Sequence, residues 1–389
     1  GVVGGVGAWR GCGGGGGGVG GAGGREGHGG GGGGAAGGVG SAGRCHREGG
    51  TPEQRRTFYS CLFRTMLRPA QDYETDAEGR ERFAYDGEVY EGRYHVNPIL
   101  WDAYRSLFAL HNIINRAEEE RYVQSLMRTQ ELTGWWPSGH VMIGNHAISV
   151  LADAWAKGIR TFDPEEALGR YYREITRSAV DTLNNGDYNR EHVRGYGRLG
   201  FEDYFAMGYI PYPQGTDRVM ETTSKTIEYN YDDFCAWQLA RMTGNKFYEE
   251  IFARVMYNYR NVFDHESGFM RGRLKDGSWL SPFDPYEWGG PYCEGNAWHY
   301  NWSVFHDVQG LINLYGSDET FTQKIDSVFT RPNIIKPGTY GGMIHEMKEM
   351  QLAEMGQYAH GNPPIQHMIY MYSHPGQPRN PQSWFRQTT

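Results

Sequence analysis

The sequence predicts a mainly α-helical fold in which helical hairpins close into a toroid, and three observations support this prediction. From Thr51 onward, apolar residues recur at helical spacing in one segment after another. These segments are joined alternately by short turns and by long loops rich in Gly, Pro and aromatic residues, and strand signals are slight. In a toroid of hairpins the long loops gather at one end and form a site. A helical solenoid is the competing architecture, but it requires a fixed repeat, and the sequence shows none.

Each predicted element rests on periodicity or on residues typical of its ends. Pro164 and the two acids after it begin a helix that runs to about Asn184. A second helix begins near Ser224 and keeps apolar residues at helical spacing until Gly244 ends it. A β-hairpin is predicted over Gly268–Trp279. The other predicted helices span Leu100–Ile114, Glu118–Leu132, His146–Lys157, Phe247–Phe263, Val304–Tyr315, Thr320–Phe329, Glu346–Gly356 and Ile365–Tyr372.

The composition divides the chain into a tail and a body. Residues 1–50 are dominated by glycine runs and contain almost no large apolar residue. Such a segment cannot bury enough surface to offset its backbone entropy, so we predict a disordered, Gly-rich, low-complexity tail. It has neither the basic start nor the apolar stretch of a signal peptide, so it does not indicate a location. Residues 51–389 are predicted to form one domain.

The charge and the cysteines exclude several classes of protein. Residues 51–389 carry 34 Lys and Arg against 44 Asp and Glu, a net charge of −10, which disfavours nucleic acid and anionic membranes as partners. No apolar run approaches the roughly 20 residues that span a bilayer. The five cysteines are far apart and show no CxxC spacing, which argues against a disulfide framework or a zinc knuckle. Cys61 and Cys235 fall on apolar helix faces and are predicted to be core thiols.

The first candidate for chemistry is Glu294, in the run PYCEGNAWHYNW. It is followed by an amide side chain, Asn296, and by a cluster of aromatics that includes Trp298. A proton donor among aromatic faces and amide hydrogen-bonding groups suits a site that cleaves sugars, because ring C–H faces stack on aromatics and hydroxyls need paired donors and acceptors. Aromatic surroundings would also raise the pKa of Glu294 by desolvation. The alternative is a helix N-terminus whose aromatics belong to the core.

Two further sets combine aromatic and polar residues. In LWDAYR, Asp102 follows Trp101, and a carboxylate beside an aromatic could hold paired sugar hydroxyls. The alternative is a carboxylate that stabilises a helix N-terminus. Asn145 and His146 follow the turn that begins with Trp135, and form another aromatic and amide set.

Metal-binding patterns are weak. The adjacent acids Asp232 and Asp233 could suggest a metal pair, but neighbouring helix residues point in different directions, so a structural role is favoured. His345 begins HEMKE, which lacks the second His of a zinc helix. His360 and Asn362 lie on a loop that enters a helix. Oxygen ligands for calcium remain open, but no loop here is diagnostic of them.

Eight segments, in this order, resemble those of glycoside hydrolase family 92, the calcium-dependent exo-acting α-mannosidases. The resemblance covers about Pro52 to Gln382, and it is specific because several motifs match in order and spacing. The matching segments are Phe58–Leu67, Leu100–Leu107, Gly134–Pro137, Gly144–Gly158, Ser224–Cys235, Gly268–Pro285, Tyr292–Leu311 and Tyr358–Pro378.

The resemblance implies a six-hairpin α/α toroid that hydrolyses terminal α-mannosides of glycans with inversion. It implies that Glu294 is the general acid and that Asp102 contacts the mannose. It also implies that His360 and Asn362 lie in the sugar and metal site, where Ca²⁺ holds two mannose hydroxyls and Asn362 is a candidate ligand. A secreted or periplasmic location follows from the family, whereas the oligomeric state is not indicated. The predicted substrate-binding residues are thus Trp101, Asp102, Trp135, Asn145, His146, Asn296, Trp298, His360 and Asn362.

The sequence departs from the family pattern in three places. The β-sandwich that normally precedes the toroid is absent. Pro363 stands where the family usually has Glu or Gln, so any side-chain hydrogen bond from that position is lost. The chain ends at Thr389, before the Gly-Asp/Asn-Asp segment in which the family carries its general base. These departures predict a partial toroid, incomplete at its C-terminus and nearly inactive. The alternative is a non-catalytic mannose-binding protein or a decayed fragment.

Overall fold

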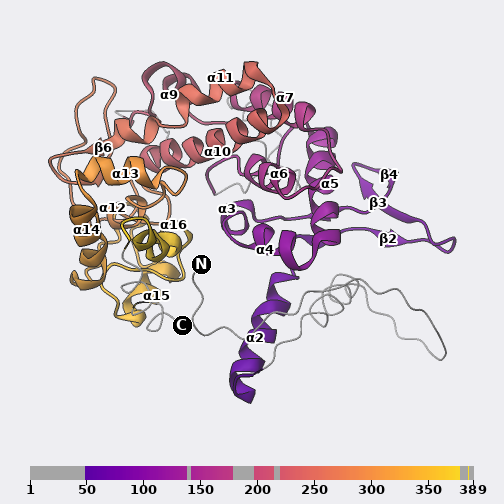
Figure 1. Cartoon of the computed structure of the whole chain (residues 1–389), viewed down its shortest axis with the longest axis horizontal. Helices are drawn as coiled ribbons and strands as arrows, with labels where there is room; N and C mark the ends of the chain where they lie inside the picture. Colours follow the sequence, from indigo (N-terminus) through magenta and orange to yellow (C-terminus); the bar gives the residue numbers. More distant parts are fainter. Residues whose placement is uncertain (1–48, 138–141, 178–196, 214–219, 377–383, 385–389) are drawn as a thin grey trace.

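The computed structural model describes residues 49–137, 142–177, 197–213, 220–376 and 384, and it is rich in helices (Figure 1). Of the predicted disordered tail, residues 1–48 lie outside the described part of the chain. Within the described part, no helix is both long and apolar enough to cross a membrane.

The first described helix, α2 (Pro52–Thr65), projects from the body of the molecule (Figure 1). Its start is stabilised by a capping box, in which Thr51 and Gln54 exchange side-chain-to-backbone hydrogen bonds of 3.2 and 3.0 Å. Leu62 is the buried residue of this helix, and Cys61 is exposed. The prediction of Cys61 as a core thiol is therefore wrong, because the helix packs through one narrow face. The same prediction for Cys235 is confirmed.

A small antiparallel sheet, not predicted from the sequence, follows α2. Its strands are short and carry many charges, so they lack the apolar alternation that identifies a strand. The strand order is β2 (Glu74–Thr75), β3 (Glu81–Tyr85) and β4 (Glu88–Glu91). A separate pair joins β1 (Ala70–Gln71) to β5 (His95–Val96).

Consecutive helices pack in pairs along the body, as expected for helical hairpins. The pairs are α4 (Leu107–Ile114) with α5 (Arg116–Thr133), α6 (Ala147–Ala156) with α7 (Pro164–Ile175), α10 (Thr222–Thr243) with α11 (Lys246–Val255), and α13 (Val308–Tyr315) with α14 (Asp318–Thr330). Helix α10 also packs against α6 and α7, which places it between two hairpins. The mainly helical class is confirmed, whereas closure of six hairpins into a toroid stays a prediction.

Short elements connect the hairpins. They are α3 (Leu100–Ala103), α9 (Phe201–Met207), η1 (Asn258–Val262), β6 (Phe263–Asp264), β7 (Phe269–Met270), α12 (Ala297–Tyr300), η2 (Gly338–Tyr340), α15 (His345–Ala353), α16 (Pro363–Gln366) and η3 (His367–Ser373). Among them, α3 carries Trp101 and Asp102, and α12 carries Trp298. The helix predicted over Leu100–Ile114 is divided into α3 and α4 by a turn. The predicted hairpin forms around the turn that follows Leu274, with one antiparallel bridge, between Arg273 and Trp279. Residues 178–184 of the helix predicted to reach Asn184 lie outside the described residues.

One buried carboxyl in the hairpin α4–α5 has a consequence for stability. Glu119 is fully buried, and neither of its oxygens has a hydrogen-bond partner among the residues that the structure describes. Burial raises its pKa to about 9, and the negative charge of Asp153 adds to the effect. The folded protein thus holds this proton up to about pH 9, whereas the unfolded chain releases it near the ordinary pKa of 4.5. Stability must therefore fall as pH rises through this window, by roughly 3 kcal/mol at pH 7.

Glu119→Gln is expected to remove this pH-dependent loss, because the amide carries no titrating proton. The unfolding free energy of the variant minus that of the natural protein, measured by urea denaturation, should be roughly 3 kcal/mol larger at pH 7.5 than at pH 5. Glu118→Gln is the matched control. His95 and Arg121 hold the pKa of Glu118 down to about 2 against the effect of burial, so its loss should lower stability at pH 7. Parallel pH dependences for Glu119→Gln and the natural protein would contradict the prediction.

Candidate active site

Glu294 lies in the loop that leads into α12, and its backbone is held from two sides. Its N–H donates to the hydroxyl of Tyr340 at 2.7 Å, and its carbonyl oxygen accepts a hydrogen bond from Asn362 Nδ2 at 2.5 Å. The residue has a φ of +44°, which is uncommon for a residue with a side chain. Strained conformations of this kind persist where the surrounding structure enforces them, often at functional sites. The structure thus brings together Glu294 and Asn362, two residues that the resemblance implicates.

The surroundings of Glu294 favour its protonated form. Burial raises its pKa to about 7, and the negative charges of Glu346 and Asp102 act in the same direction, while His345 opposes them. A carboxyl group with this pKa still carries a proton near neutral pH and can donate it. The desolvation that the aromatic sequence context predicted is therefore confirmed as the main cause.

The carboxylates that act on Glu294 come from separate elements. Asp102 lies on α3 and is exposed to solvent. Partial desolvation nevertheless raises its pKa, and the positive charge of Arg105 opposes this shift. Glu221 precedes α10, and Glu346 lies in the first turn of α15. The backbone is strained where α10 and α3 begin. Glu221, the residue before α10, has a φ of +60°, and Ile99, the residue before α3, has a φ of +47°. A positive φ is costly for a β-branched residue, so the position of α3 is set by tertiary contacts.

The predicted aromatic residues are largely buried. Trp101 is 3% exposed and Trp298 is 4% exposed, and the indole nitrogen of each lacks a hydrogen-bond partner within the described part of the chain. Trp298 packs edge-on against Phe269, with ring centroids 4.8 Å apart. Trp135 is 9% exposed, and the guanidinium of Arg177 lies 3.4 Å from its ring centroid. Contact of these rings with a sugar stays a prediction.

Asn296 has a structural role that the sequence did not reveal. Its side-chain oxygen caps α12 by accepting the N–H of Trp298 at 3.0 Å, and its Nδ2 donates to Gln357 at 3.2 Å. Both ends of the amide are therefore occupied by protein groups. His360, by contrast, is exposed, and its Nδ1 lies 2.9 Å from the Tyr358 hydroxyl.

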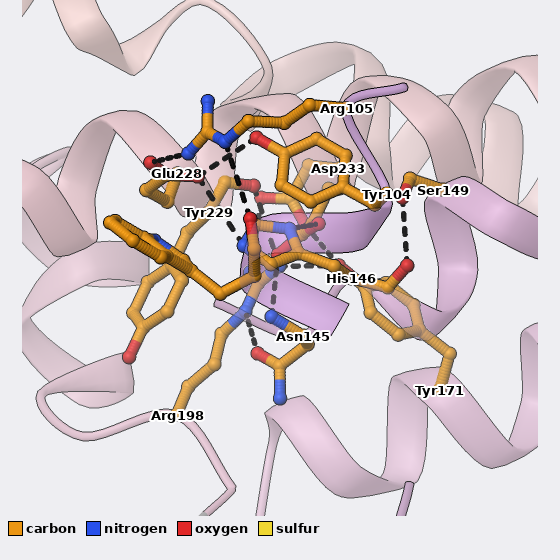
Figure 2. Close-up of polar contacts among 12 residues, drawn as sticks. Tyr104, Arg105, Asn145, His146, Ser149, Tyr171, Arg198, Glu228, Tyr229 and Asp233 are labelled. Atoms are coloured by element: carbon orange, nitrogen blue, oxygen red, sulfur yellow. Dashed lines mark hydrogen bonds and ion pairs between the residues drawn. The ribbon is translucent and has the colours of Figure 1, made fainter. Parts of the chain in front are cut away.

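Asn145 belongs to a buried polar network that joins α6, α7 and α10 (Figure 2). Its backbone N–H donates to Asp232 at 2.7 Å, and its Nδ2 donates to Glu174 at 3.0 Å. Its side-chain oxygen accepts a hydrogen bond from Arg198 Nε at 3.1 Å. Arg198 also pairs with Asp233, with Nη2 and Oδ1 2.8 Å apart. Asp232 and Asp233 are thus occupied by protein partners, in agreement with the structural role predicted for them.

His146 belongs to the same network. Its Nδ1 lies 2.8 Å from Asp232 Oδ1, its Nε2 lies 3.3 Å from Glu228 Oε2, and its ring stacks on Tyr104 with centroids 4.0 Å apart. Glu228 in turn pairs with Arg105 at 2.8 Å. The network therefore extends to the segment that carries Trp101. Direct contact of Asn145 or His146 with a substrate stays a prediction.

Four charged members of this network were not predicted from the sequence: Arg105, Glu174, Arg198 and Glu228. All four are charged residues within or beside apolar helical segments, which is a signal of a buried polar network. Burial raises the pKa of Glu174 to about 7, while hydrogen bonds from Trp136 and Asn145 oppose this shift.

A calcium site is only partly supported by these residues. Asn362 is fully buried, and its side-chain oxygen has no partner among the described residues, so it could serve as one oxygen ligand. The described ranges contain no group of three or more His, Cys, Asp or Glu arranged to hold a metal ion. A calcium ion bound to Asn362 would therefore need further oxygen ligands.

A desolvated carboxyl among further carboxylates is typical of the sites of glycoside hydrolases. Residues 43–389 match the model of the glycosyl hydrolase family 92 catalytic domain, and the chain therefore belongs to this family.

The structure is similar to solved structures of the same family. One is the family 92 inverting mannosidase of Bacteroides thetaiotaomicron, with a TM-score of 0.73 and 40% identity, over 86% of this chain and 44% of that chain. Another is a family 92 α-mannosidase of the same organism in complex with mannoimidazole, with a TM-score of 0.70 and 28% identity, over 86% of this chain and 42% of that chain. A secreted glycosidase of Arthroderma benhamiae, itself described as uncharacterized, is 27% identical over 311 residues, which are 70% of this chain and 34% of that protein. The chain spans less than half the length of each of these relatives.

Proposed function

We propose that the protein hydrolyses terminal α-linked mannose from glycans with inversion, and that Glu294 is its general acid. The observation that carries the proposal is the environment of Glu294, in which burial and neighbouring carboxylates raise the pKa to about 7 and two hydrogen bonds hold the backbone. Family membership and the similarity to an inverting mannosidase support mannosides as the substrate class. Secretion is part of the proposal, supported by the secreted relative.

In the proposed mechanism, the Glu294 carboxyl donates its proton to the glycosidic oxygen as the bond to the anomeric carbon breaks. Inversion requires a second carboxylate that activates water on the opposite face of the sugar. We assign Asp102 to the binding of mannose hydroxyls, and we assign no described residue as the base. Calcium is proposed as a cofactor that holds mannose hydroxyls, with Asn362 Oδ1 as one ligand.

The proposal is tested by incubating the protein with α-linked mannobiose and following the products by proton NMR, with and without a calcium chelator. The expected result is slow release of mannose, because no described residue acts as the base, with β-mannose as the first product, because inversion changes the anomeric configuration. The chelator should slow the release further. Binding of methyl α-mannoside without any release of mannose would contradict hydrolysis and favour a mannose-binding protein. Absence of both binding and release would overturn the proposal.

A further inference from the structure

The loop that carries Glu294 packs closely against η2. The N–H of Thr339 donates to the carbonyl oxygen of Trp288 at 3.3 Å, and the Thr339 hydroxyl oxygen accepts the N–H of Gly290 at 2.8 Å. A Cβ atom at Gly338 would lie only 2.2 Å from the Trp288 carbonyl oxygen, so only glycine allows the two backbones to approach this closely. The position of this loop therefore depends on η2, which comes from a later segment of the chain.

Tyr340, the last residue of η2, contacts the candidate acid itself. Its hydroxyl oxygen accepts the N–H of Glu294 at 2.7 Å. The Tyr340 ring packs against the core, so the position of its hydroxyl is fixed by packing. Burial raises the pKa of the phenol above its ordinary value of 10, so the hydroxyl keeps its proton near neutral pH. Tyr340 is thus a neutral hydrogen-bond acceptor at a defined place beside the backbone of Glu294.

This hydrogen bond matters because the backbone of Glu294 is strained. Its φ of +44° brings Cβ close to a carbonyl oxygen, which is unfavourable for a residue with a side chain. The cost of such a φ is similar in size to the gain from one or two hydrogen bonds. Two bonds hold this conformation, from the Tyr340 hydroxyl at the N–H and from the Asn362 amide at the carbonyl oxygen. Loss of one bond should therefore release the strained backbone, which would turn the Cα–Cβ bond and move the carboxyl.

We propose that Tyr340 is a positioning residue whose hydroxyl fixes the backbone of Glu294, so that the carboxyl points in the direction needed for proton donation. The inference rests on the proposed function and extends it from the acid to the residue that orients it. Tyr340 acts only through Glu294 in this role, because its hydroxyl is bonded to the backbone N–H. Asn362 holds the other side of the residue, but it is also a candidate calcium ligand, so Tyr340 gives the clearer test.

The test is Tyr340→Phe, which removes the hydroxyl and keeps the ring. Without its acceptor, the Glu294 N–H is expected to exchange with solvent about tenfold faster, measured by NMR on protein with isotopically labelled glutamate. The signal of Glu294 is identified by its absence in Glu294→Gln. The kcat for mannobiose should fall about tenfold with KM unchanged, because the acid is misdirected while the groups that bind the sugar stay in place. Hydrolysis of a 2,4-dinitrophenyl α-mannoside, whose leaving group needs no proton, should fall by less than about twofold.

Tyr292→Phe is the matched control. Tyr292 lies on the same loop as Glu294, but its hydroxyl donates to the carbonyl oxygen of Met270 at 2.6 Å. This variant should lose stability, and it should keep both the exchange rate of the Glu294 N–H and the ratio of the rates on the two substrates.

Two results for Tyr340→Phe would overturn the positioning role. One is an unchanged exchange rate of the Glu294 N–H, and the other is an equal loss of kcat on the two substrates, which indicates general disruption of the site. Absence of sugar release by the natural protein would instead overturn the proposed function, and the exchange rate would still decide whether Tyr340 fixes the backbone of Glu294.

Discussion

Glu294→Gln is expected to lower the rate of mannobiose hydrolysis by roughly 10²- to 10⁴-fold, because the amide has no proton to give to the leaving oxygen. The loss should depend on the leaving group. A 2,4-dinitrophenyl α-mannoside leaves as a stable anion and needs no proton, so its hydrolysis should fall by less than about tenfold. Sugar release from both substrates, compared between the variant and the natural protein, measures this difference. Equal losses on the two substrates would contradict a role of Glu294 as general acid.

The same assignment predicts the direction of the pH dependence. The active form of a general acid is protonated, and the pKa of Glu294 is about 7. The rate of mannobiose hydrolysis should therefore hold below pH 7 and fall about tenfold per pH unit above it. The exposed Glu250, replaced by Gln, serves as the control and should leave both the rate and the profile unchanged. A profile without a basic limb between pH 6 and 9 would contradict the assignment.

Arg198→Met is expected to lower the unfolding free energy by about 3–5 kcal/mol, because it leaves a buried carboxylate without its partner. Arg198 and Asp233 are both fully buried and are joined by contacts of 2.8 and 3.1 Å. Although burial opposes its charge, the carboxylate of Asp233 holds the pKa of Arg198 well above its ordinary value. Substitution by Met keeps the approximate volume and removes the charge together with the hydrogen bonds to Asn145 and Tyr171. Denaturation in urea measures the loss.

A double-mutant cycle separates the ion pair from general disruption of the core. The variant that combines Arg198→Met with Asp233→Asn should lose less stability than the sum of the two single losses, because no charge remains unpaired. Arg241→Met is the surface control. Arg241 is 53% exposed and lies 3.7 Å from Glu249, so its loss should change stability by less than about 1 kcal/mol. Additive losses in the cycle would show that the two groups act independently.

The local sequence predicted a desolvated carboxyl at Glu294, and burial is the main cause of its raised pKa. Its role as general acid stays a prediction, which came from the family resemblance. Residue types alone did not indicate that the carboxylates of Asp102 and Glu346 act on Glu294. They lie 192 residues before it and 52 residues after it, and only the packing of α3 and α15 brings their charges to bear on it.

The Asn145 and His146 set shows where residue types were ambiguous. An amide and an imidazole beside aromatics suit a sugar site, but they also suit a buried polar network, and the structure shows them in the latter. The choice depends on their partners, Asp232 and Arg198, which lie on other segments of the chain. Sequence periodicity reports which face of a helix is buried but not which polar groups meet there.

By itself, the sequence determined the mainly helical class, because periodicity and end residues are local properties. It also proposed Glu294 as the acid, and this assignment stays a prediction. Tertiary structure decided how the acid is held and what surrounds it. Asn362 and Tyr340 hold its backbone from separate segments, and the charges of Asp102 and Glu346 come from two other elements. Hydrogen bonds and charge interactions act over a few ångströms, so they depend on which distant segments meet, and residue types alone do not state this.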